Sequence, residues 1–510
     1  MSLIVCSALR RWNNGRLDCR AAMPLSVIHE DTTMEDYRYR QIEQQLMLQI
    51  SSGTLGPGAR LPSLRHVSLR SRVAVSTVLQ AYAELERKGV IESRPRSGFF
   101  VRRDTRQLPP PPRNPRPLLR PHTVNRSQLI SAVLETVGDR ELVPLGINCP
   151  SEDLLPYREL AKVAARLSRE DPKRQVGYLP VEGSLELRRQ LSLRASQAGL
   201  AVRPEEIIIT CGALEALHVA VRSLVRPGDN VLIQAPSYFC FQQLLENQGV
   251  RSIEIPSHPR HGVDPVDVER ALGRFDISAC ILTPNFNNPD GSLTSDSAKH
   301  EIVELLARRE IPLIEDDVAG DLHFGPARPT VFKMYDRAGL VVLCSSLSKT
   351  LCPGYRIGWI MPGRFYREAY EVKATTNVCS ATLTQEAVGV YLREGRYDRH
   401  LRGLRRALQE QTQAMQLHVS RTFPEGTRVG RPEGGGLLWV ELPTGVDSVE
   451  LMYRAREAGI SIAPGTIFST QDRFSGHVRL NSGNPWTEEL AGGVERLGRL
   501  VAEMVGGAGR

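Results

Sequence analysis

The sequence lacks a hydrophobic run long enough to cross a membrane, because none of its apolar stretches approaches the roughly 18 residues that a spanning helix needs. Residues 1–33 also lack the apolar segment of a signal peptide. We interpret them as a flexible extension, or as the product of an upstream start that precedes Met34. These absences favour a cytoplasmic protein with no membrane partner.

Patterned cysteines are missing as well. The nine cysteines are scattered, their number is odd, and no Cys-x-x-Cys pair occurs. Such a set argues against a disulfide framework and against a zinc site, and it fits a reducing compartment, so we expect no bound metal.

A single ordinary domain is excluded by the length of the chain, because 510 residues with a hydrophobic content of 41% can build several cores. The charge is also divided. Residues 34–103 carry twelve Arg and Lys against six Asp and Glu, and residues 104–126 add five Arg against one Asp, although the whole chain has a net charge of only +8. Basic charge concentrated in a small module is typical of a protein that meets a polyphosphate.

The pattern of residues 34–103 predicts three helices followed by a hairpin. Apolar residues recur at helical spacing in residues 42–50 and again in residues 78–85, and Ser63 is suited to cap a helix between them. Residues 90–101 indicate two short strands around a basic turn. Together these elements describe a winged helix-turn-helix.

Three strings within this module resemble the sequence boxes of the GntR family: Leu61-Pro62-Ser63-Leu64-Arg65, Ser76-Thr77-Val78-Leu79-Gln80-Ala81-Tyr82 and Ser97-Gly98-Phe99-Phe100-Val101. The resemblance implies that the module binds a double-stranded DNA operator, with the third helix in the major groove. The residues that it assigns to DNA contact are Ser63, Arg65, Ser76, Thr77, Ser97 and Gly98. Ala74 and Val75 stand where the family often has a serine and an arginine, so the base preference should differ.

Residues 104–126 are rich in proline and arginine and include four consecutive prolines at positions 109–112. Such a stretch cannot form a helix and prefers an extended polyproline II path. We therefore predict a semi-rigid linker that separates the front module from the rest of the chain.

Lys349 stands in a polar string that covers residues 345–358 and is hard to explain by packing alone. The hydroxyl groups of Ser346 and Ser348 precede this lysine, and Arg356 follows it. An amine can attack an aldehyde to form a Schiff base, while hydroxyl and guanidinium groups suit a phosphate. Pyridoxal 5′-phosphate needs both kinds of group.

This string resembles the lysine signature of class I aminotransferases of fold type I, and further segments resemble the family's motifs in the expected order. The resemblance implies pyridoxal 5′-phosphate as cofactor, with Lys349 as the catalytic residue that binds it and with a phosphate site. The residues implied for the phosphate are Gly212, Ala213, Ser346, Ser348 and Arg356. It also implies a homodimer, because the family's tyrosine, here Tyr178, reaches the cofactor phosphate of the other subunit.

The same resemblance assigns residues to the rest of the cofactor. Tyr238 is implied to stack on the pyridine ring, and Asn288 to bind the ring oxygen. Asp316, with Asp317 as the alternative, is implied to pair with the pyridine nitrogen and keep the ring protonated. Arg479 is implied to bind the carboxylate of a substrate or effector through a bidentate pair.

One position departs from the family's pattern. Aminotransferases of this type usually carry a tyrosine three residues after the aspartate, bonded to the ring oxygen, whereas this chain has Ala319. Alanine cannot donate a hydrogen bond, so a contact that tunes the Schiff base is missing. The departure argues against efficient catalysis and leaves cofactor binding intact.

Strands alternate with helical stretches between residues 207 and 343, which predicts a mostly parallel sheet covered on both faces. We expect an aminotransferase-like domain over residues 127–510, with a large α/β part at about 127–376 and a smaller α+β part at about 377–510. Placed behind a winged helix-turn-helix, this domain gives an order that resembles the MocR subfamily of GntR-type bacterial regulators.

Three functional hypotheses follow. The leading one is a transcription regulator that binds pyridoxal 5′-phosphate through a Schiff base and couples the cofactor, or an amino acid or amine effector, to operator affinity. The second is an active aminotransferase with an appended DNA-binding module, and the third is a sensor of the cofactor alone that does not use Arg479. Ala319 favours a regulator, whereas Arg479 leaves a transaminase half-reaction open.

Overall fold

The chain divides into two units, Met1–Gln107 and Leu108–Arg510. The computed structural model describes residues 30–51, 54–56, 58–87, 89–94, 97–101, 108–122, 127–471 and 473–507. Some of the predictions fall on residues that lie outside the described ones. These are residues 1–29 of the N-terminal extension, residues 95–96 at the centre of the basic turn, and residues 104–107 and 123–126 of the predicted linker.

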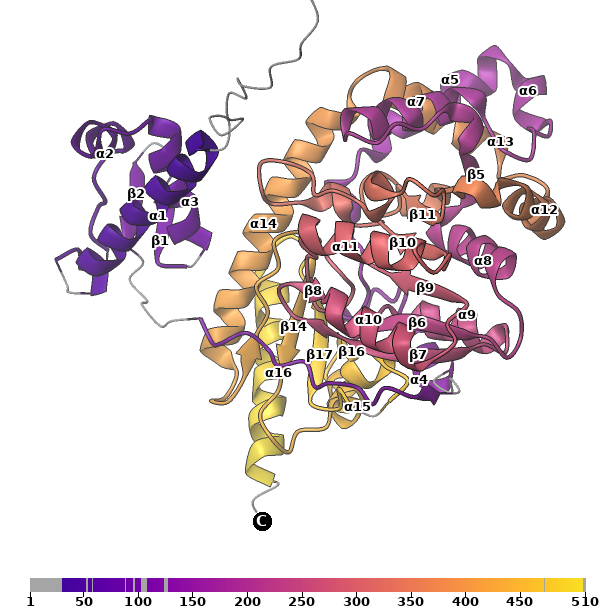
Figure 1. The fold of residues 1–510 in the computed structure, drawn as a ribbon. Helices are drawn as coiled ribbons and strands as arrows, with labels where there is room; N and C mark the ends of the chain where they lie inside the picture. The colour runs from indigo at the N-terminus through magenta and orange to yellow at the C-terminus, as the bar shows by residue number, and fades with distance from the viewer. Residues whose placement is uncertain are drawn as a thin grey trace, which may run out of the picture. The chain divides into compact units, whose positions relative to one another are not determined.

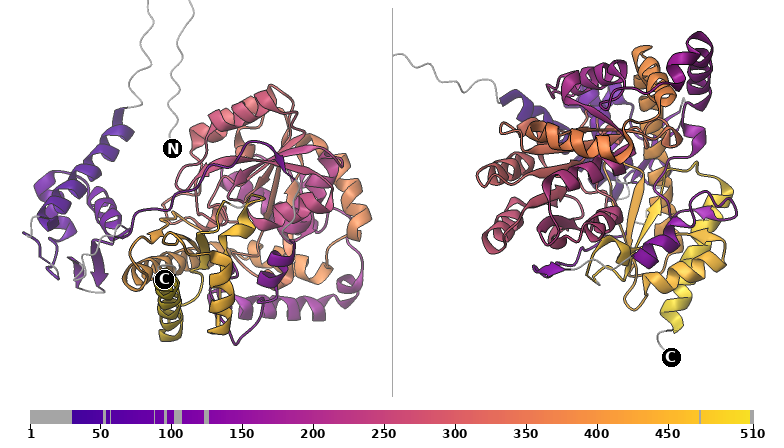
Figure 2. Two further views of the ribbon diagram at one scale, coloured as in Figure 1. Left: turned by 90° about the horizontal axis from the view of Figure 1, so that it is seen from below. Right: turned by 90° about the vertical axis from the view of Figure 1, so that its right-hand side faces the viewer.

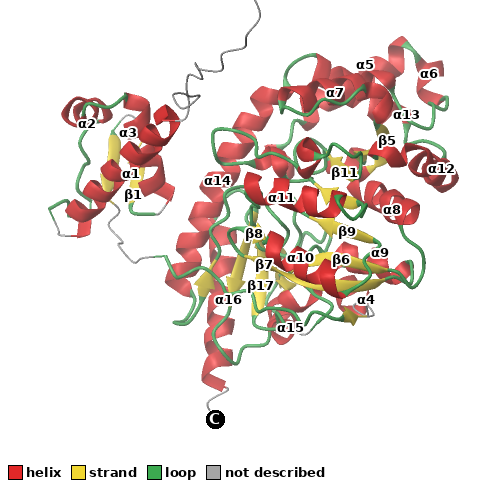
Figure 3. Cartoon of the chain, in the orientation of Figure 1, coloured by secondary structure: helices red, strands yellow, loops and turns green. Residues whose placement is uncertain are grey.

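The described residues of the first unit form three helices and a hairpin (Figures 1 and 3). Its elements are α1 (Glu30–Ser51), α2 (Leu64–Ser71), α3 (Val75–Arg87), β1 (Ile91–Arg94) and β2 (Gly98–Val101). The hydroxyl of Ser63 caps α2 by accepting a hydrogen bond from the backbone N–H of His66 at 3.2 Å. Ile42, Leu46, Val78 and Leu85 are buried in one core, and the predicted winged helix-turn-helix is confirmed.

The second unit is built around a large mixed sheet with the strand order β3-β7-β6-β9-β10-β11-β12-β5, and β8 pairs with β7. Its central strands run parallel, and β12 is antiparallel to both of its neighbours. The strands are β3 (Pro121–His122), β5 (Ile208–Cys211), β6 (Asn230–Ala235), β7 (Arg251–His258), β8 (Gly262–Val263), β9 (Ala279–Leu282), β10 (Leu313–Asp316), β11 (Val341–Ser346) and β12 (Ile357–Met361). The predicted fold-type I domain with a mostly parallel sheet is confirmed.

Helices cover both faces of this sheet. Successive residues of a strand point to opposite sides, so neighbouring residues of one strand pack against different helices. Val231 and Ile233 pack in the core beneath α8 (Gly212–Leu224), α9 (Phe239–Asn247) and α12 (Tyr366–Asn377). Leu232, which lies between them, packs against α10 (Pro265–Arg274) and α11 (Asp296–Ala307). One end of the unit is covered by α5 (Tyr157–Glu170), α6 (Pro172–Val176), α7 (Leu185–Gln197) and α13 (Thr382–Arg393) (Figure 1).

The smaller part has a sheet of order β13-β14-β17-β16 covered by helices. Its elements include α14 (Tyr397–Thr422), β13 (Arg428–Val429), β14 (Leu437–Glu441), α15 (Ser448–Glu457), β15 (Ile460–Ser461), β16 (Ala463–Pro464), β17 (His477–Asn481) and α16 (Glu488–Gly507). Figure 2 shows these elements, in orange and yellow, beside the large sheet.

Residues near 127–145 differ from the prediction that they belong to the large part. They form α4 (Ser127–Leu134) and β4 (Val143–Pro144), and β4 pairs with β15. Ile130, Val133 and Val143 are buried in the core cluster that contains the sheet and helices of the smaller part, together with Ala235 and Phe239 of the large part. The pairing joins segments about 300 residues apart, which the order of motifs along the sequence does not reveal.

Residues 108–122, which we call the strap, belong to the second unit although they were predicted as part of a linker. The backbone N–H of Val429 donates to Pro110 O at 2.9 Å, and Pro121–His122 form the edge strand β3 beside β7. The strap is extended, as its prolines require, but it lies on the surface of the unit (Figure 1). Within the described residues, no helix is both long and apolar enough to span a membrane.

Candidate functional site

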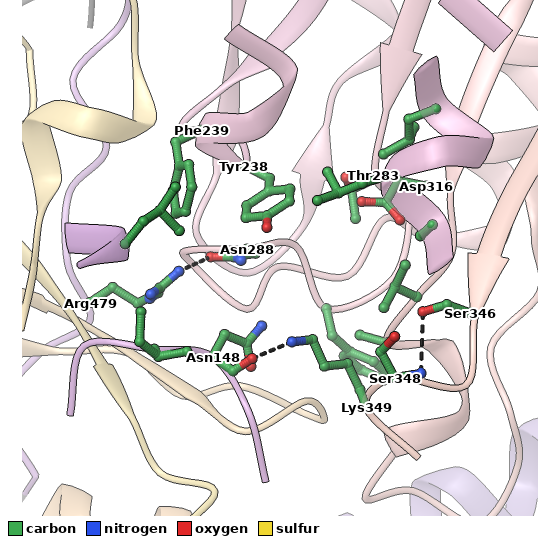
Figure 4. A pocket seen from close by; sticks show the side chains of 18 of the residues that line it. Asn148, Tyr238, Phe239, Thr283, Asn288, Asp316, Ser346, Ser348, Lys349 and Arg479 are labelled. Atoms are coloured by element: carbon green, nitrogen blue, oxygen red, sulfur yellow. Dashed lines mark hydrogen bonds between the residues drawn. The ribbon is translucent and has the colours of Figure 1, made fainter. Parts of the chain in front are cut away.

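A cavity of about 240 Å³ lies beyond the ends of β9, β10 and β11, and Arg479 of β17 borders its other side (Figure 4). Parallel strands that end together at one edge commonly leave a crevice there for a ligand. The structure brings together most of the residues predicted for cofactor and effector, since the lining includes Ala213, Tyr238, Asn288, Asp316, Ser346, Ser348, Lys349, Arg356 and Arg479.

Lys349 follows β11, and its Nζ donates to the backbone carbonyl of Asn148 (Figure 4). Burial lowers the pKa of the Lys349 amine, and the positive charges of Arg479 and Arg356 lower it further, although Cys149 acts in the opposite direction. A lowered pKa increases the neutral fraction of the amine, which is the form that attacks a carbonyl. Sequence reasoning missed Asn148, because only its backbone carbonyl takes part and its residue type carries no signal.

The groups predicted for a phosphate gather at the start of α8. The Arg356 guanidinium donates to Ser348 Oγ at 3.3 Å and to Cys211 O at 3.3 Å, and the backbone N–H of Ser348 donates to Ser346 Oγ at 3.3 Å. Free N–H groups at a helix start attract anions. This corner therefore combines a helix terminus, two hydroxyl groups and one guanidinium.

Gly212 does not line the cavity but shapes this corner. Its φ is +76°, which favours glycine, and a Cβ there would collide with the guanidinium of Arg356. Gly358 is equally restricted, because a Cβ on it would collide with the backbone of Gly212. The two glycines let β12 and the start of α8 approach closely enough to hold Arg356.

Asp316 points into the cavity with one carboxylate oxygen unsatisfied, because its buried Oδ1 has no hydrogen-bond partner among the described residues. Burial raises the pKa of this carboxyl to about 7, and the negative charge of Asp317 contributes to the shift. Asp317, the alternative, lies outside this cavity, where it pairs with Arg328 and accepts from Asn285 Nδ2 at 2.9 Å. The geometry therefore favours Asp316 as the partner of a ring nitrogen.

Arg479 is only 1% exposed and has no ion-pair partner among the described residues. Its Nη1 donates to Asn288 Oδ1 at 2.9 Å, its Nη2 donates to Gly146 O, and its buried Nε has no partner. Burial lowers the pKa of this guanidinium to about 10. A buried cation held only by neutral groups is suited to bind a carboxylate.

The remaining predicted positions divide between the cavity and the surface. Tyr238 faces the cavity, with its ring 4.8 Å from that of Phe239 (Figure 4). Ala319 also lines the cavity and offers no donor there. Tyr178 is 88% exposed and lies away from the cavity of its own chain, so its predicted contact with another subunit stays a prediction.

The residues present fit pyridoxal 5′-phosphate. Asp316 Oδ1 lacks a donor that a protonated ring nitrogen would supply, and Lys349 lies in the same cavity as the anion-binding corner. The donor set matches an aldehyde, a pyridine nitrogen and a phosphate, each at a separate part of the lining.

The residues predicted to contact DNA are not all accessible. Arg65 and Ser76 are exposed, as are Ser63, Ser97 and Gly98, whereas Thr77 is only 6% exposed. Thr77 lies four residues before the buried Ala81, so both occupy the inner face of α3. The structure therefore separates Thr77 from the exposed face that carries Ser76.

The comparisons with known proteins match each of the two units to a family. The model of aminotransferases of class I and II matches residues 140–497, and that of bacterial regulatory proteins of the gntR family matches residues 38–101. The chain is 35% identical, over 92% of its length and 100% of the relative, to the uncharacterized HTH-type transcriptional regulator YdcR of Escherichia coli. It is 33% identical, over 70% of its length and 89% of the relative, to 2-aminoadipate transaminase of Thermus thermophilus.

A solved aminotransferase structure is also similar to the second unit. LysN, an α-aminoadipate aminotransferase of Thermus thermophilus complexed with N-(5′-phosphopyridoxyl)-L-leucine, is 30% identical in sequence and superposes with a TM-score of 0.68. The superposition covers 74% of this chain and 95% of that one.

Proposed function

The chain belongs to the class I and II aminotransferase family and carries a GntR-family helix-turn-helix domain in front of it, and from this premise we propose that it is a transcription regulator controlled by pyridoxal 5′-phosphate. The cofactor, with or without an amino acid or amine effector, alters the affinity of the first unit for a DNA operator. Such control requires two conformations that bind the ligand with different affinity.

The cavity supports the cofactor assignment. When bound, pyridoxal 5′-phosphate supplies an electrophilic aldehyde carbon and an electron-withdrawing ring. Lys349 offers an amine of lowered pKa for the covalent bond, and Asp316 Oδ1 would accept a hydrogen bond from the protonated ring nitrogen. Ser346, Ser348 and Arg356 would hold the phosphate together with the start of α8.

Arg479 supports an effector that carries a carboxylate. The guanidinium is buried without an anion, and one carboxylate would replace the weak neutral partners that it has now. Because Arg479 also donates to Asn288, an effector that draws the guanidinium away changes the loop that carries this asparagine.

The observation that carries the regulatory proposal is the contact of the strap with this same loop. Asn114 Nδ2 donates to Asp290 Oδ2 at 3.0 Å and to Ser257 O at 2.9 Å. Asp290 stands two residues after Asn288, and its Oδ1 accepts from Asn287 Nδ2 at 2.8 Å. The chain segment that leads from the DNA-binding unit is thus hydrogen-bonded to the loop beside the cofactor cavity.

A second set of hydrogen bonds joins the strap to β14 and to β17, the strand that carries Arg479. Trp439 Nε1 donates to Asn114 Oδ1 at 3.2 Å, and Trp439 lies opposite Arg479 in the sheet. His477 Nε2 contacts Arg113 O at 3.1 Å, and burial lowers the pKa of this imidazole to about 4. Movement of either the loop or β17 therefore acts on the strap directly.

The test measures operator affinity of the full chain with and without saturating pyridoxal 5′-phosphate, using a DNA fragment selected from a random library. We expect the cofactor to change the dissociation constant by about 5- to 150-fold, the usual range of allosteric coupling. Asn114→Ala should bring this ratio close to one, because it removes the bonds to Asp290 and Trp439.

Arg116→Gln is the matched control, since Arg116 lies on the same strap with a side chain that is 73% exposed. It should keep the coupling ratio of the natural protein. A natural protein whose operator affinity is the same with and without cofactor would contradict the regulatory proposal, whatever the variants do.

An active aminotransferase is the second candidate, and the unpaired Arg479 favours it together with the similarity to 2-aminoadipate transaminase. Ala319 argues against rapid turnover, because alanine offers no hydroxyl at the position where the family usually has a tyrosine. Rapid steady-state transamination by the natural protein would establish this alternative. A cofactor sensor without effector, the third candidate, predicts that Arg479→Ala leaves the DNA response to cofactor unchanged.

A further inference from the structure

A second cavity, of about 330 Å³, lies among α7, α14 and the segment that follows β10. Its volume falls in the range of roughly 300–1,000 Å³ that small-molecule sites occupy. Its lining is partly apolar and includes Leu191, Leu200, Val331, Met334, Leu343 and Trp359. The lining also includes three arginines and three aspartates.

This second cavity lies behind the cofactor cavity, across the ends of β10 and β11. Asp316 lines the cofactor cavity and Asp317 lines the second one. At the end of β11 and just after it, Ser346 and Ser348 line the first cavity, whereas Leu347 between them lines the second. Because neighbouring residues of these two segments line different cavities, the two spaces share one layer of backbone.

Two of the three arginines are already engaged by carboxylates. Arg328 pairs with Asp317 and donates to Asp321 Oδ1 at 2.7 Å. Arg194 donates to Asp398 at 2.9 Å and lies 4.3 Å above the ring of Tyr397. These contacts fix the positions of both guanidinium groups.

Arg405 differs from these two. Its Nε donates to the backbone carbonyl of Asp321 at 2.6 Å, and among the described residues no carboxylate pairs with its guanidinium. Asp398 is 59% exposed, so water screens much of its charge. The enclosed part of the wall therefore holds Arg194, Arg328 and Arg405 against only Asp317 and Asp321, an excess of positive charge.

We propose that this second cavity is a binding site for a small carboxylic acid with an apolar tail. The carboxylate pairs with Arg405, whose two terminal nitrogens form a fork that matches it. The tail lies against Met334, Leu343 and Trp359. The buried Nε1 of Trp359 has no acceptor among the described residues, which leaves a donor for a second polar atom near the tail.

Occupancy of this site acts on the cofactor cavity, a step that rests on the proposed function, whereas binding itself does not. A bound anion adds negative charge beside Asp317 and competes with it for Arg328. The negative charge of Asp317 in turn raises the pKa of Asp316, the preceding residue of the chain. Coupling between two sites is reciprocal, so the acid and the cofactor should change each other's affinity by the same factor.

The test is calorimetric titration of the full chain, loaded with pyridoxal 5′-phosphate, with hexanoate as probe and hexan-1-ol as its uncharged counterpart. We expect hexanoate to bind in the millimolar range or better and hexan-1-ol about tenfold more weakly, because the alcohol cannot form the charged pair. Arg405→Met, which keeps the aliphatic stem, should weaken hexanoate about tenfold. Arg406→Met, at the neighbouring exposed position of α14, should leave it unchanged.

Ala195→Trp tests the apolar side, because Ala195 lines the second cavity and a large ring there fills it. This variant should bind no hexanoate while its cofactor absorbance stays that of the natural protein. Binding of hexanoate that survives both Arg405→Met and Ala195→Trp would overturn the proposal. So would binding that only Arg479→Ala abolishes, since the acid would then lie in the cofactor cavity.

The coupling step has its own readout. The dissociation constant of pyridoxal 5′-phosphate, measured with and without saturating hexanoate, should change in the natural protein and not in Arg405→Met. Unchanged cofactor affinity despite hexanoate binding would leave the site in place and remove only its link to the proposed regulation.

Discussion

The two units of the protein use charge in opposite ways. In the first unit, the side chains predicted for DNA contact, such as Arg65 and Ser76, are exposed and solvated. In the second unit, Asp316 and Arg479 are buried ionisable groups that form no ion pair with any described residue. An exposed charge costs the fold little and acts over a distance that salt controls. A buried charge costs the fold stability until a ligand satisfies it.

This difference indicates that control of the protein by a ligand originates in the second unit. A cofactor that satisfies Asp316 and the anion-binding corner should stabilise the second unit, because it binds the folded state and not the unfolded one. Among the described residues of the first unit that are predicted to contact DNA, none is a buried charged side chain. The strap residue Asn114 joins the loop beside the cavity to the segment that leads to the first unit.

The largest expected effect concerns Lys349. Lys349→Ala should abolish the visible absorbance that pyridoxal 5′-phosphate gains on the protein, together with the adduct that borohydride fixes. The reason is that, among the described residues, Lys349 is the only lysine that lines the cavity. Lys162→Ala, at an exposed lysine, is the control and should retain both signals. Mass spectrometry after borohydride treatment measures the adduct, and an unchanged adduct in Lys349→Ala would refute the assignment.

The next effect concerns the buried carboxyl of Asp316. Its pKa is raised to about 7 in the folded protein, so the folded state holds a proton that the unfolded state releases above about pH 4. Stability of the cofactor-free protein should therefore fall as pH rises from about 4 to 7, and Asp316→Asn should remove this part of the fall.

The expected gain for Asp316→Asn at pH 8 is on the order of 4 kcal/mol in the free energy of unfolding, because a shift of about three pKa units is worth about 1.4 kcal/mol per unit. Urea unfolding of both proteins at pH 5 and pH 8 measures it. If the free energies of unfolding of the two proteins differ by the same amount at pH 5 and pH 8, Asp316 is ionised at both pH values. Other groups then offset the cost of burying its charge.

Operator affinity is expected to respond less strongly to a single change in the first unit. Arg65→Ala should weaken operator binding by about 1–3 kcal/mol if this exposed arginine of α2 meets a base or a phosphate, as we predict. The logarithm of affinity should also fall steeply with the logarithm of salt concentration. Arg406→Ala is the control in the second unit, and cofactor binding should survive both changes.

The sequence was most informative where the chemistry depends on residue type. The lysine string and the order of the motifs were sufficient to predict the fold class, which the structure and the comparisons confirm. They left Asp316 and Asp317 open, because neighbouring residues in a strand point to opposite sides and only the structure shows which side holds the cavity.

What the sequence could not reveal depends on contacts between distant segments. The strap was predicted as a spacer because prolines indicate an extended path but not what that path lies against. Asn114 contacts Asp290 and Trp439, which stand about 180 and 330 residues further along the chain. The same limitation applies to Val143, whose partner strand β15 lies near the opposite end of the sequence.

The smallest expected effect separates the two faces of α3. Thr77 is buried beside the core of the first unit, so Thr77→Val, which keeps the shape of the side chain, should change operator affinity by less than about 0.5 kcal/mol. Ser76→Ala, on the exposed face of the same helix, should cost about 1 kcal/mol if its hydroxyl meets DNA. Titrations of both variants with the same operator, alongside thermal unfolding of each, decide between the faces. A loss of affinity in Thr77→Val without a loss of stability would mean that the buried hydroxyl turns outward on DNA, and the contrast between an exposed reader and a buried ligand site would then no longer hold for this helix.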